Sequence, residues 1–204
     1  MIKKEVKFLD TVPSETITLE EKSDLLLIGL ITKGWEGTRE FVVNASGQSS
    51  SLRAIFFILG EKNDCFLFNI TTIHNADDTL IHTRVRCALT DYAVCNVSGV
   101  AKVQEKINGA DSYFSHHTLL LSENSSAKAA PNLEIKSDSV KAGHAASVGK
   151  VDDEALFYLL SRGINEKDAK ALLVQGFFET EMNEIEDEDM KKTIREAITK
   201  FLFK

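Results

Sequence analysis

The sequence lacks the features that would place the protein in a membrane, on nucleic acid or in a disulfide framework. It has only three cysteines among 204 residues, with no CxxC pair. This odd number argues against a disulfide framework, and the spacing excludes zinc knuckles and ferredoxin-type clusters. The start carries no signal-peptide segment, and the longest apolar run, residues 25–31, is too short to cross a membrane. The net charge of −7 provides no basic surface for a phosphate backbone. We therefore expect a cytoplasmic protein with no nucleic-acid or membrane partner.

Motifs of common catalytic sites are also missing. The sequence contains no Walker A, GxGxxG, GxSxG or HExxH pattern. The acidic run at residues 184–189 is most simply the solvated start of a helix, where nothing would raise a carboxyl pKa. Cys65, Cys87 and Cys95 are best explained as small buried hydrophobic side chains, with Cys65 in a strand. We expect that the chain is not an enzyme.

Residues 1–150 have the composition and patterning of strands. Short runs rich in Val, Ile, Thr and Phe alternate with clusters of Asn, Asp, Gly and Ser. A weak strand–corner–strand repeat recurs, and its corners are mostly not of the Asn-Gly or Asp-Gly hairpin type. Stacked coils of a parallel β-helix therefore explain the pattern better than an antiparallel sandwich does. The repeat begins at Leu19, Leu59, Leu89, Leu121 and Ile135.

Residues 151–204 are predicted to form a small helical subdomain of three helices. Asp152 is a suitable N-cap for the first helix, which Gly163 ends, and the second runs from Asn165 to Gly176. The third follows the acidic run and has an apolar stripe from Met190 to Leu202. Part of this apolar surface should cover the open end of the β-region or dock a partner, and capping is the commoner role.

A long composite motif resembles the C-terminal core of the SufB/SufD family, and the SufD branch in particular. Its parts keep the order and spacing of the family pattern, which implies a right-handed parallel β-helix with a small C-terminal helical subdomain. Family members usually carry a further N-terminal region, so this chain resembles a short form. The matching segments are LLLSEN at residues 119–124, PNLEI at 131–135, VKAGHAASVG at 140–149, DEALFYLLSRGI at 153–164 and GF at 176–177.

The resemblance implies a scaffold or accessory role in SUF-type iron–sulfur cluster assembly. Family proteins pair through their β-helices, as homodimers or with a SufB-type protomer, and their C-terminal helices dock a SufC-type ABC ATPase. The expected docking anchors are Phe157, Tyr158, Arg162 and Phe177, because aromatic and Arg side chains dominate interface energetics. The alternative for Phe157 and Phe177 is a place in the core.

His144 matches the family histidine near the subunit interface. The resemblance therefore implies that it handles iron or a transient iron–sulfur cluster shared between subunits. The alternative is a hydrogen-bonded structural histidine. SufB-type members have a cysteine before the LL strand and a Glu after the histidine, but these positions hold His116 and Ala145 here. The resemblance thus implies that the SufB cluster-building pair is absent.

The other histidines are weaker candidates. His116 and His117 are neighbours on an expected strand, so they point to opposite faces and at most one can face a metal site. His74 and His82 are expected at the surface or in turns. Two other functions stay open: a metal-dependent enzyme using His144 and His116, and a β-helix interaction module without an assembly role.

Overall fold

The computed structural model describes residues 3–10 and 14–203, which form eleven strands followed by three helices. Odd-numbered strands form a six-stranded sheet, here sheet A, and even-numbered strands form a five-stranded sheet, here sheet B. The strands are β1 (Lys3–Leu9), β2 (Glu15–Leu19), β3 (Ser23–Ile31), β4 (Thr38–Ala45), β5 (Ser51–Gly60), β6 (Cys65–His74), β7 (Leu80–Leu89), β8 (Val94–Val103), β9 (Asp111–Leu120), β10 (Ser126–Ile135) and β11 (Lys141–Gly149). The helices are α1 (Asp153–Ser161), α2 (Glu166–Met182) and α3 (Glu188–Leu202).

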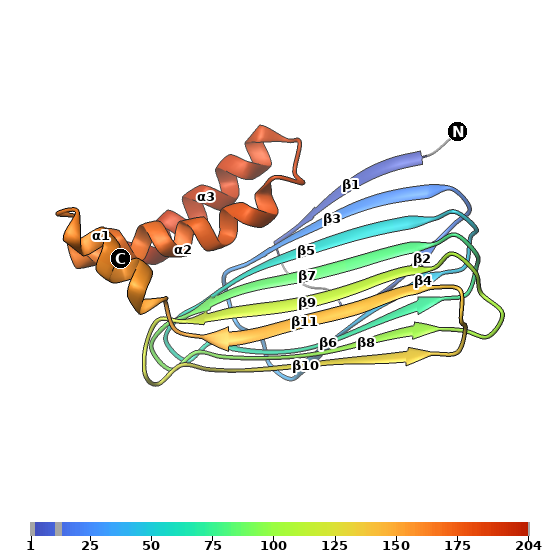
Figure 1. The fold of residues 1–204 in the computed structure, drawn as a ribbon, viewed down its shortest axis with the longest axis horizontal. Helices are drawn as coiled ribbons and strands as arrows, with labels where there is room; N and C mark the ends of the chain where they lie inside the picture. Colours follow the sequence, from blue (N-terminus) through green and yellow to red (C-terminus); the bar gives the residue numbers. More distant parts are fainter. Residues whose placement is uncertain (1–2, 11–13, 204) are drawn as a thin grey trace.

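Successive strands alternate between the two sheets, so the chain winds as a parallel β-helix (Figure 1). Each strand pairs in parallel with the strand two positions along the sequence: β5 pairs with β7, and β6 pairs with β8. This confirms the expected fold of stacked coils followed by helices. We call the space enclosed by the two sheets the lumen.

The corners between strands are stacked and hydrogen-bonded through their backbones. Tyr92 N donates to Lys62 O over 2.9 Å at one end of the coils, and Asp78 N donates to Asn108 O over 2.9 Å at the other. Corner residues such as Lys62, Asp78 and Asp91 adopt left-handed φ values of 54–55°. The backbone ladder therefore continues around the turns, and no hairpin glycine is required there.

The sequence repeat corresponds to two different stacks of corners. The copies at Leu59, Leu89 and Leu121 lead from sheet A to sheet B. The copies at Leu19 and Ile135 lead from sheet B to sheet A, at the opposite end of the coils. This mixture explains why the spacing of the repeat is irregular.

The lumen is filled by apolar side chains from both sheets. Strand β6 alternates half-buried and buried residues along its whole length, as expected when one face points inward. Phe56 of sheet A packs edge-to-face on Phe41 and Phe68 of sheet B, with ring centroids 5.5 Å and 5.2 Å apart. These rings are buried and tie the two sheets together.

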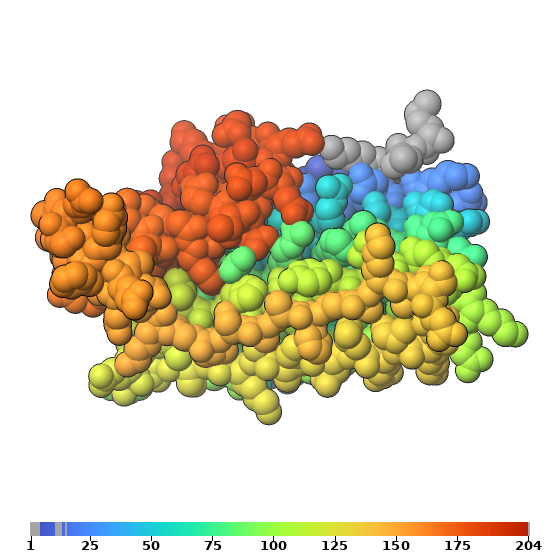
Figure 2. Space-filling view, in the orientation of Figure 1, coloured from blue at the N-terminus to red at the C-terminus, as the bar shows by residue number. Residues whose placement is uncertain are grey.

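Helices α2 and α3 cover the outer face of sheet A over β3, β5 and β7 (Figures 1 and 2). The ring centroids of Phe57 in β5 and Phe178 in α2 lie 6.1 Å apart. Ile28 and Ile194 belong to the same buried cluster. The expectation that the helices cap an open end of the coils is therefore wrong for α2 and α3. Strands β3 and β5 are apolar on both faces, so each needs a second cover outside the lumen.

A partly buried ionic cluster around the buried Glu181 holds α2 on sheet A. Arg86 donates to Glu181 Oε1 from Nε over 2.9 Å and from Nη2 over 2.6 Å. Arg84 forms an ion pair with Glu184, and its Nε lies 3.6 Å from Glu181 Oε2. These pairs fix the helix over the sheet more specifically than apolar contact does.

The helix ends agree with the sequence in three of four places. Asp152 and Asn165 are N-caps whose side chains accept from Ala155 N and Asp168 N. Gly163 adopts φ 86° just after α1, as a helix stop requires. Gly176, however, lies inside α2, and the prediction that it ends this helix is wrong. The turns beyond it bury Phe178 and Met182 against sheet A, and that packing outweighs the helix cost of one glycine.

Among residues 3–10 and 14–203, no helix is long and apolar enough to span a membrane.

Candidate functional site

The last coil leaves the C-terminal end of the lumen open. Leu133, Ile135 and Val148 occupy inward-facing positions, yet they are 36%, 37% and 40% exposed. Strands β10 and β11 are the last strands of their sheets, so each has one edge that no strand of the described chain pairs with. We call this surface, made of Leu133, Ile135, His144 and Val148, the open end. Figure 2 shows that β10 and β11 run uncovered along one side of the molecule.

His144 lies at the open end. It is exposed and pairs in register with Phe114 of β9, whose side chain points into the lumen. The neighbouring inward positions on β11 hold the small residues Ala142 and Ala146. The imidazole of His144 is therefore available to a partner that covers this end of the coils.

His116 and His117 point to opposite sides of sheet A, as the strand periodicity predicts. His116 is fully buried in the lumen, where its Nε2 lies 2.8 Å from Thr118 Oγ1. His117 lies on the outer face, with Nδ1 2.7 Å from Ser147 Oγ. Burial, followed by the charge of Arg86, lowers the pKa of His117. The structure thus separates an exposed His144 from an enclosed His116.

The expectation for His74 is wrong. This residue ends β6 fully buried in the lumen, and its Nδ1–H donates to Thr79 Oγ1 over 2.7 Å, because that hydroxyl already donates to Ala76 O. Burial lowers the pKa of His74 to about 4. His82 lies half-buried on the outer face, and its Nε2 donates to Asp111 over 2.8 Å.

A group of exposed apolar side chains lies on α1. Phe157, Tyr158 and Leu160 are 72%, 56% and 39% exposed. The Arg162 guanidinium lies over the Tyr158 ring, 5.1 Å from its centroid. We call these four residues the α1 patch. In Figure 1, α1 projects beyond the end of the sheets.

Phe177 does not belong to the α1 patch. Its ring is half-buried beside Phe178, with centroids 5.2 Å apart, and the Arg86 guanidinium lies 4.8 Å from its centroid. It therefore contributes to the contact between α2 and sheet A.

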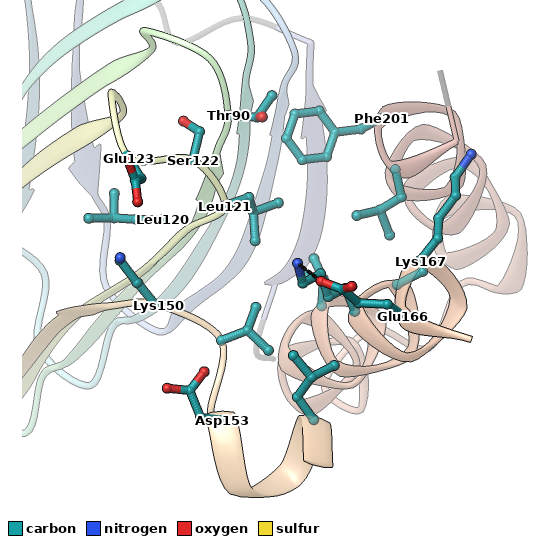
Figure 3. Close-up of a pocket in the computed structure, with 16 residues that line it drawn as sticks. Thr90, Leu120, Leu121, Ser122, Glu123, Lys150, Asp153, Glu166, Lys167 and Phe201 are labelled. Carbon is teal, nitrogen blue, oxygen red and sulfur yellow. Dashed lines mark hydrogen bonds and ion pairs between the residues drawn. The ribbon is translucent and has the colours of Figure 1, made fainter. Parts of the chain in front are cut away.

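A pocket of about 500 Å³ separates the helices from the corners that lead to β8 and β10 (Figure 3). Its lining includes apolar side chains from a corner, from the segment after β11 and from all three helices. Lys150, Lys167, Glu123 and Asp153 add charges of both signs. Sequence reasoning missed this pocket, because only folding brings these distant segments together. The apolar lining residues include Leu121, Val151, Leu156, Val174 and Phe201.

No part of the described chain brings three or more His, Cys, Asp or Glu side chains into an arrangement that could hold a metal ion.

Comparison with known proteins places the chain among iron–sulfur assembly proteins. A family described as "SUF system FeS cluster assembly, SufBD core domain" matches residues 10–177. The chain is 38% identical over 139 residues to the iron–sulfur cluster assembly protein SufD of Bacillus subtilis, covering 68% of this chain and 31% of that protein. It is 28% identical over 149 residues to SufD of Escherichia coli, covering 73% of this chain and 35% of that protein. The chain thus spans about a third of the length of these relatives.

Proposed function

Because the chain belongs to the SufB/SufD family of iron–sulfur cluster assembly proteins, we propose that it is a non-enzymatic scaffold or accessory protein of SUF-type assembly in the cytoplasm. It docks a SufC-type ABC ATPase through its C-terminal helices. It pairs through its β-helix with a SufB-type protomer or with a second copy of itself.

The observation that carries the docking proposal is the exposure of the α1 patch. Phe157 and Tyr158 are large aromatic side chains that contribute little to the core of this chain, since α1 buries no residue. Burying such rings, with an Arg stacked on one of them, is typical of the energetic centre of an interface. Leu172 of α2, which is 48% exposed, adds a further apolar side chain on the helical subdomain.

Phe177 is a supporting residue in this proposal. Its contacts with Arg86 and Phe178 connect α2 to sheet A, so a change at Phe177 would act on the orientation of the helices. We therefore expect its substitution to weaken docking less than substitution at Phe157.

The pairing proposal is supported by the open end. Inward-facing side chains that are more than a third exposed, beside two unpaired strand edges, form a surface that an added β-structure can cover. His144 lies on this surface, so a partner there would enclose it. We propose that its imidazole then contributes one ligand to iron or to a transient cluster, which is the cargo of the assembly.

Isothermal titration of the purified chain with a SufC-type ATPase from the same cell tests the docking. We expect a Kd of about 1 μM or tighter and a loss of at least tenfold in the Phe157→Ala/Arg162→Ala double variant. Tyr92→Ala is the matched control, because Tyr92 is 63% exposed at a corner of the β-helix, outside the helical subdomain. No binding by the wild type, or equal loss in the control, would contradict the proposal.

A further inference from the structure

The pocket between the helices and the corners is used neither by the proposed docking nor by the proposed pairing (Figure 3). Its volume of about 500 Å³ is typical of pockets that hold small molecules. Its walls come from the corners after β7 and β9, from the segment after β11 and from all three helices. The pocket is therefore a candidate binding site that is separate from the α1 patch and from the open end.

Much of the apolar lining of this pocket is still in contact with water. Ala171 and Val174 of α2 are buried, but the other apolar lining residues are only half-buried. An apolar ligand body that fills the pocket removes this surface from water, which is favourable. The half-buried apolar residues are Leu120, Leu121, Val151, Leu156, Phe201 and Leu202.

Three of the charged side chains in the lining already interact with other groups of the helical subdomain. Lys170 Nζ donates to Glu166 Oε1 over 2.6 Å. Lys167 Nζ lies 5.3 Å from the centroid of the Phe203 ring. These groups therefore have partners without a ligand.

The other charged groups of the lining are Glu123, Lys150 and Asp153, which lie on one side of the pocket in Figure 3. Within the part of the chain that the structure describes, none of the three side chains forms an ion pair or a hydrogen bond with another side chain. A ligand with only an anionic group meets two carboxylates there, and a ligand with only a cationic group meets an ammonium. A ligand that carries an ammonium and a carboxylate close together is complementary to all three groups.

We propose that this pocket binds an α-amino acid with a large apolar side chain. The carboxylate of the ligand pairs with Lys150, and its ammonium pairs with Glu123 or Asp153. Its side chain lies between Leu121 and Phe201, where the pocket is apolar. The ion pairs are exposed and mainly fix the orientation, whereas burial of the side chain supplies most of the affinity.

An NMR chemical-shift titration of the whole chain with four small molecules tests the proposal. We expect L-phenylalanine to bind with a Kd of about 1 mM or tighter. Phenylpropanoate lacks the ammonium, phenethylamine lacks the carboxylate and glycine lacks the apolar body, so each should bind at least about tenfold more weakly. No binding of L-phenylalanine at about 10 mM would overturn the proposal. Equal binding of phenylpropanoate would also overturn it.

Two variants locate the site. Lys150→Met should weaken binding of L-phenylalanine by about tenfold, without weakening binding of phenethylamine, because it removes only the group that faces the carboxylate. Leu156→Trp places a larger ring in the pocket and should weaken binding of both molecules by at least about tenfold. Lys192→Met is the matched control, because Lys192 is exposed on α3 and does not line this pocket.

Circular dichroism checks that each variant is folded. If Leu156→Trp does not fold, Lys150→Met decides alone, because it changes an exposed side chain. Unchanged binding of L-phenylalanine by Lys150→Met, or an equal loss in Lys192→Met, would overturn the proposal. The Phe157→Ala/Arg162→Ala variant should bind L-phenylalanine like the wild type, because neither residue lines the pocket. Failure of ATPase docking and failure of amino-acid binding are therefore distinguishable.

Discussion

Strands β5 and β11 belong to the same sheet but have opposite environments. Strand β5 buries both faces, with Phe56 pointing into the lumen and Phe57 toward α2, and it pairs with strands on both sides. Every residue of β11 is exposed or half-buried, and among the described strands only β9 pairs with it. Strands of the same backbone geometry therefore lie in the core at β5 and at the molecular surface at β11.

The difference lies in side-chain volume. Strand β5 has the sequence SLRAIFFILG, whereas β11 has KAGHAASVG. Large apolar groups on both faces of β5 must both be shielded from water, and the lumen side chains cover one face while α2 and α3 cover the other. The small side chains of β11 give up little burial free energy by remaining in water, so the exposure of the last coil costs the folded chain little stability. The four predictions below test this contrast, from the largest expected effect to the smallest.

Truncation of a core ring should show the contrast most strongly. Phe56→Ala should lower the free energy of unfolding by about 3–5 kcal/mol, because it opens a cavity among Phe41 and Phe68. Leu133→Ala at the open end should cost less than about 1 kcal/mol, because the side chain already contacts water. Urea unfolding of both variants measures the difference. Equal losses would mean that the last coil is packed as tightly as the middle.

The buried His74 should make the closed part of the lumen sensitive to acid. Its pKa is about 4 in the folded chain against 6.5 ordinarily, so the unfolded chain binds a proton that the folded chain does not bind between these values. The contribution of His74 to the free energy of unfolding should be fully present above pH 6.5. It should fall by about 3 kcal/mol as the pH approaches 4.

His74→Asn provides the comparison for this pH effect. Its amide can still donate to Thr79 but does not titrate, so the variant should lack this contribution. Unfolding at a series of pH values checks the prediction, and parallel curves for variant and wild type would contradict it. Carboxylates that titrate in the same range affect both proteins alike.

The ionic contact between α2 and sheet A should contribute less to the free energy of unfolding than a ring in the lumen core does. It should contribute more than an exposed ion pair. Arg86→Ala removes both hydrogen bonds to the buried Glu181 Oε1 and should cost about 2–3 kcal/mol. Arg195→Ala breaks the exposed Arg195–Glu179 pair and should cost less than about 1 kcal/mol.

The ion-pair origin of the Arg86 effect can be tested in the same denaturation experiment. Arg86→Met/Glu181→Gln should recover part of the loss, because it leaves no buried charge without its partner. Absence of any recovery would assign the effect to lost packing on Phe177 instead.

The smallest effect on stability is expected at the open end, where the effect on association should be large. Val148→Glu should change the free energy of unfolding by less than about 1 kcal/mol, because Val148 is 40% exposed. It should weaken pairing with a SufB-type protomer or a second copy by at least tenfold, since it places a charge on the covered surface. Sedimentation velocity measures the pairing. Unchanged association would locate the pairing surface elsewhere.

Much of the fold could be predicted from local patterns. The strand texture of residues 1–150, the N-caps Asp152 and Asn165 and the left-handed Gly163 all depend on neighbours close in sequence. Gly176 could not be placed in this way. Its helix continues because Phe178 and Met182 contact a sheet formed more than a hundred residues earlier, a contact that helix propensity does not include.

The candidate site was predictable only in part. Strand periodicity separated His116 from His117, and the α1 residues were found from the family motif. Periodicity could not show that His116 is enclosed while His144 is exposed, because both occupy inward positions on neighbouring strands. Their difference depends on which coil is last.

The sequence by itself determined that the chain winds into parallel coils, ends in three helices and belongs to one family of assembly proteins. Alternating apolar residues, polar corners and helix caps act over a few residues, so they can be read along the chain. Only the tertiary structure decided that α2 and α3 cover β3, β5 and β7 and that the last coil stays open. These features depend on which distant segments exclude water from each other, and a linear pattern does not specify that.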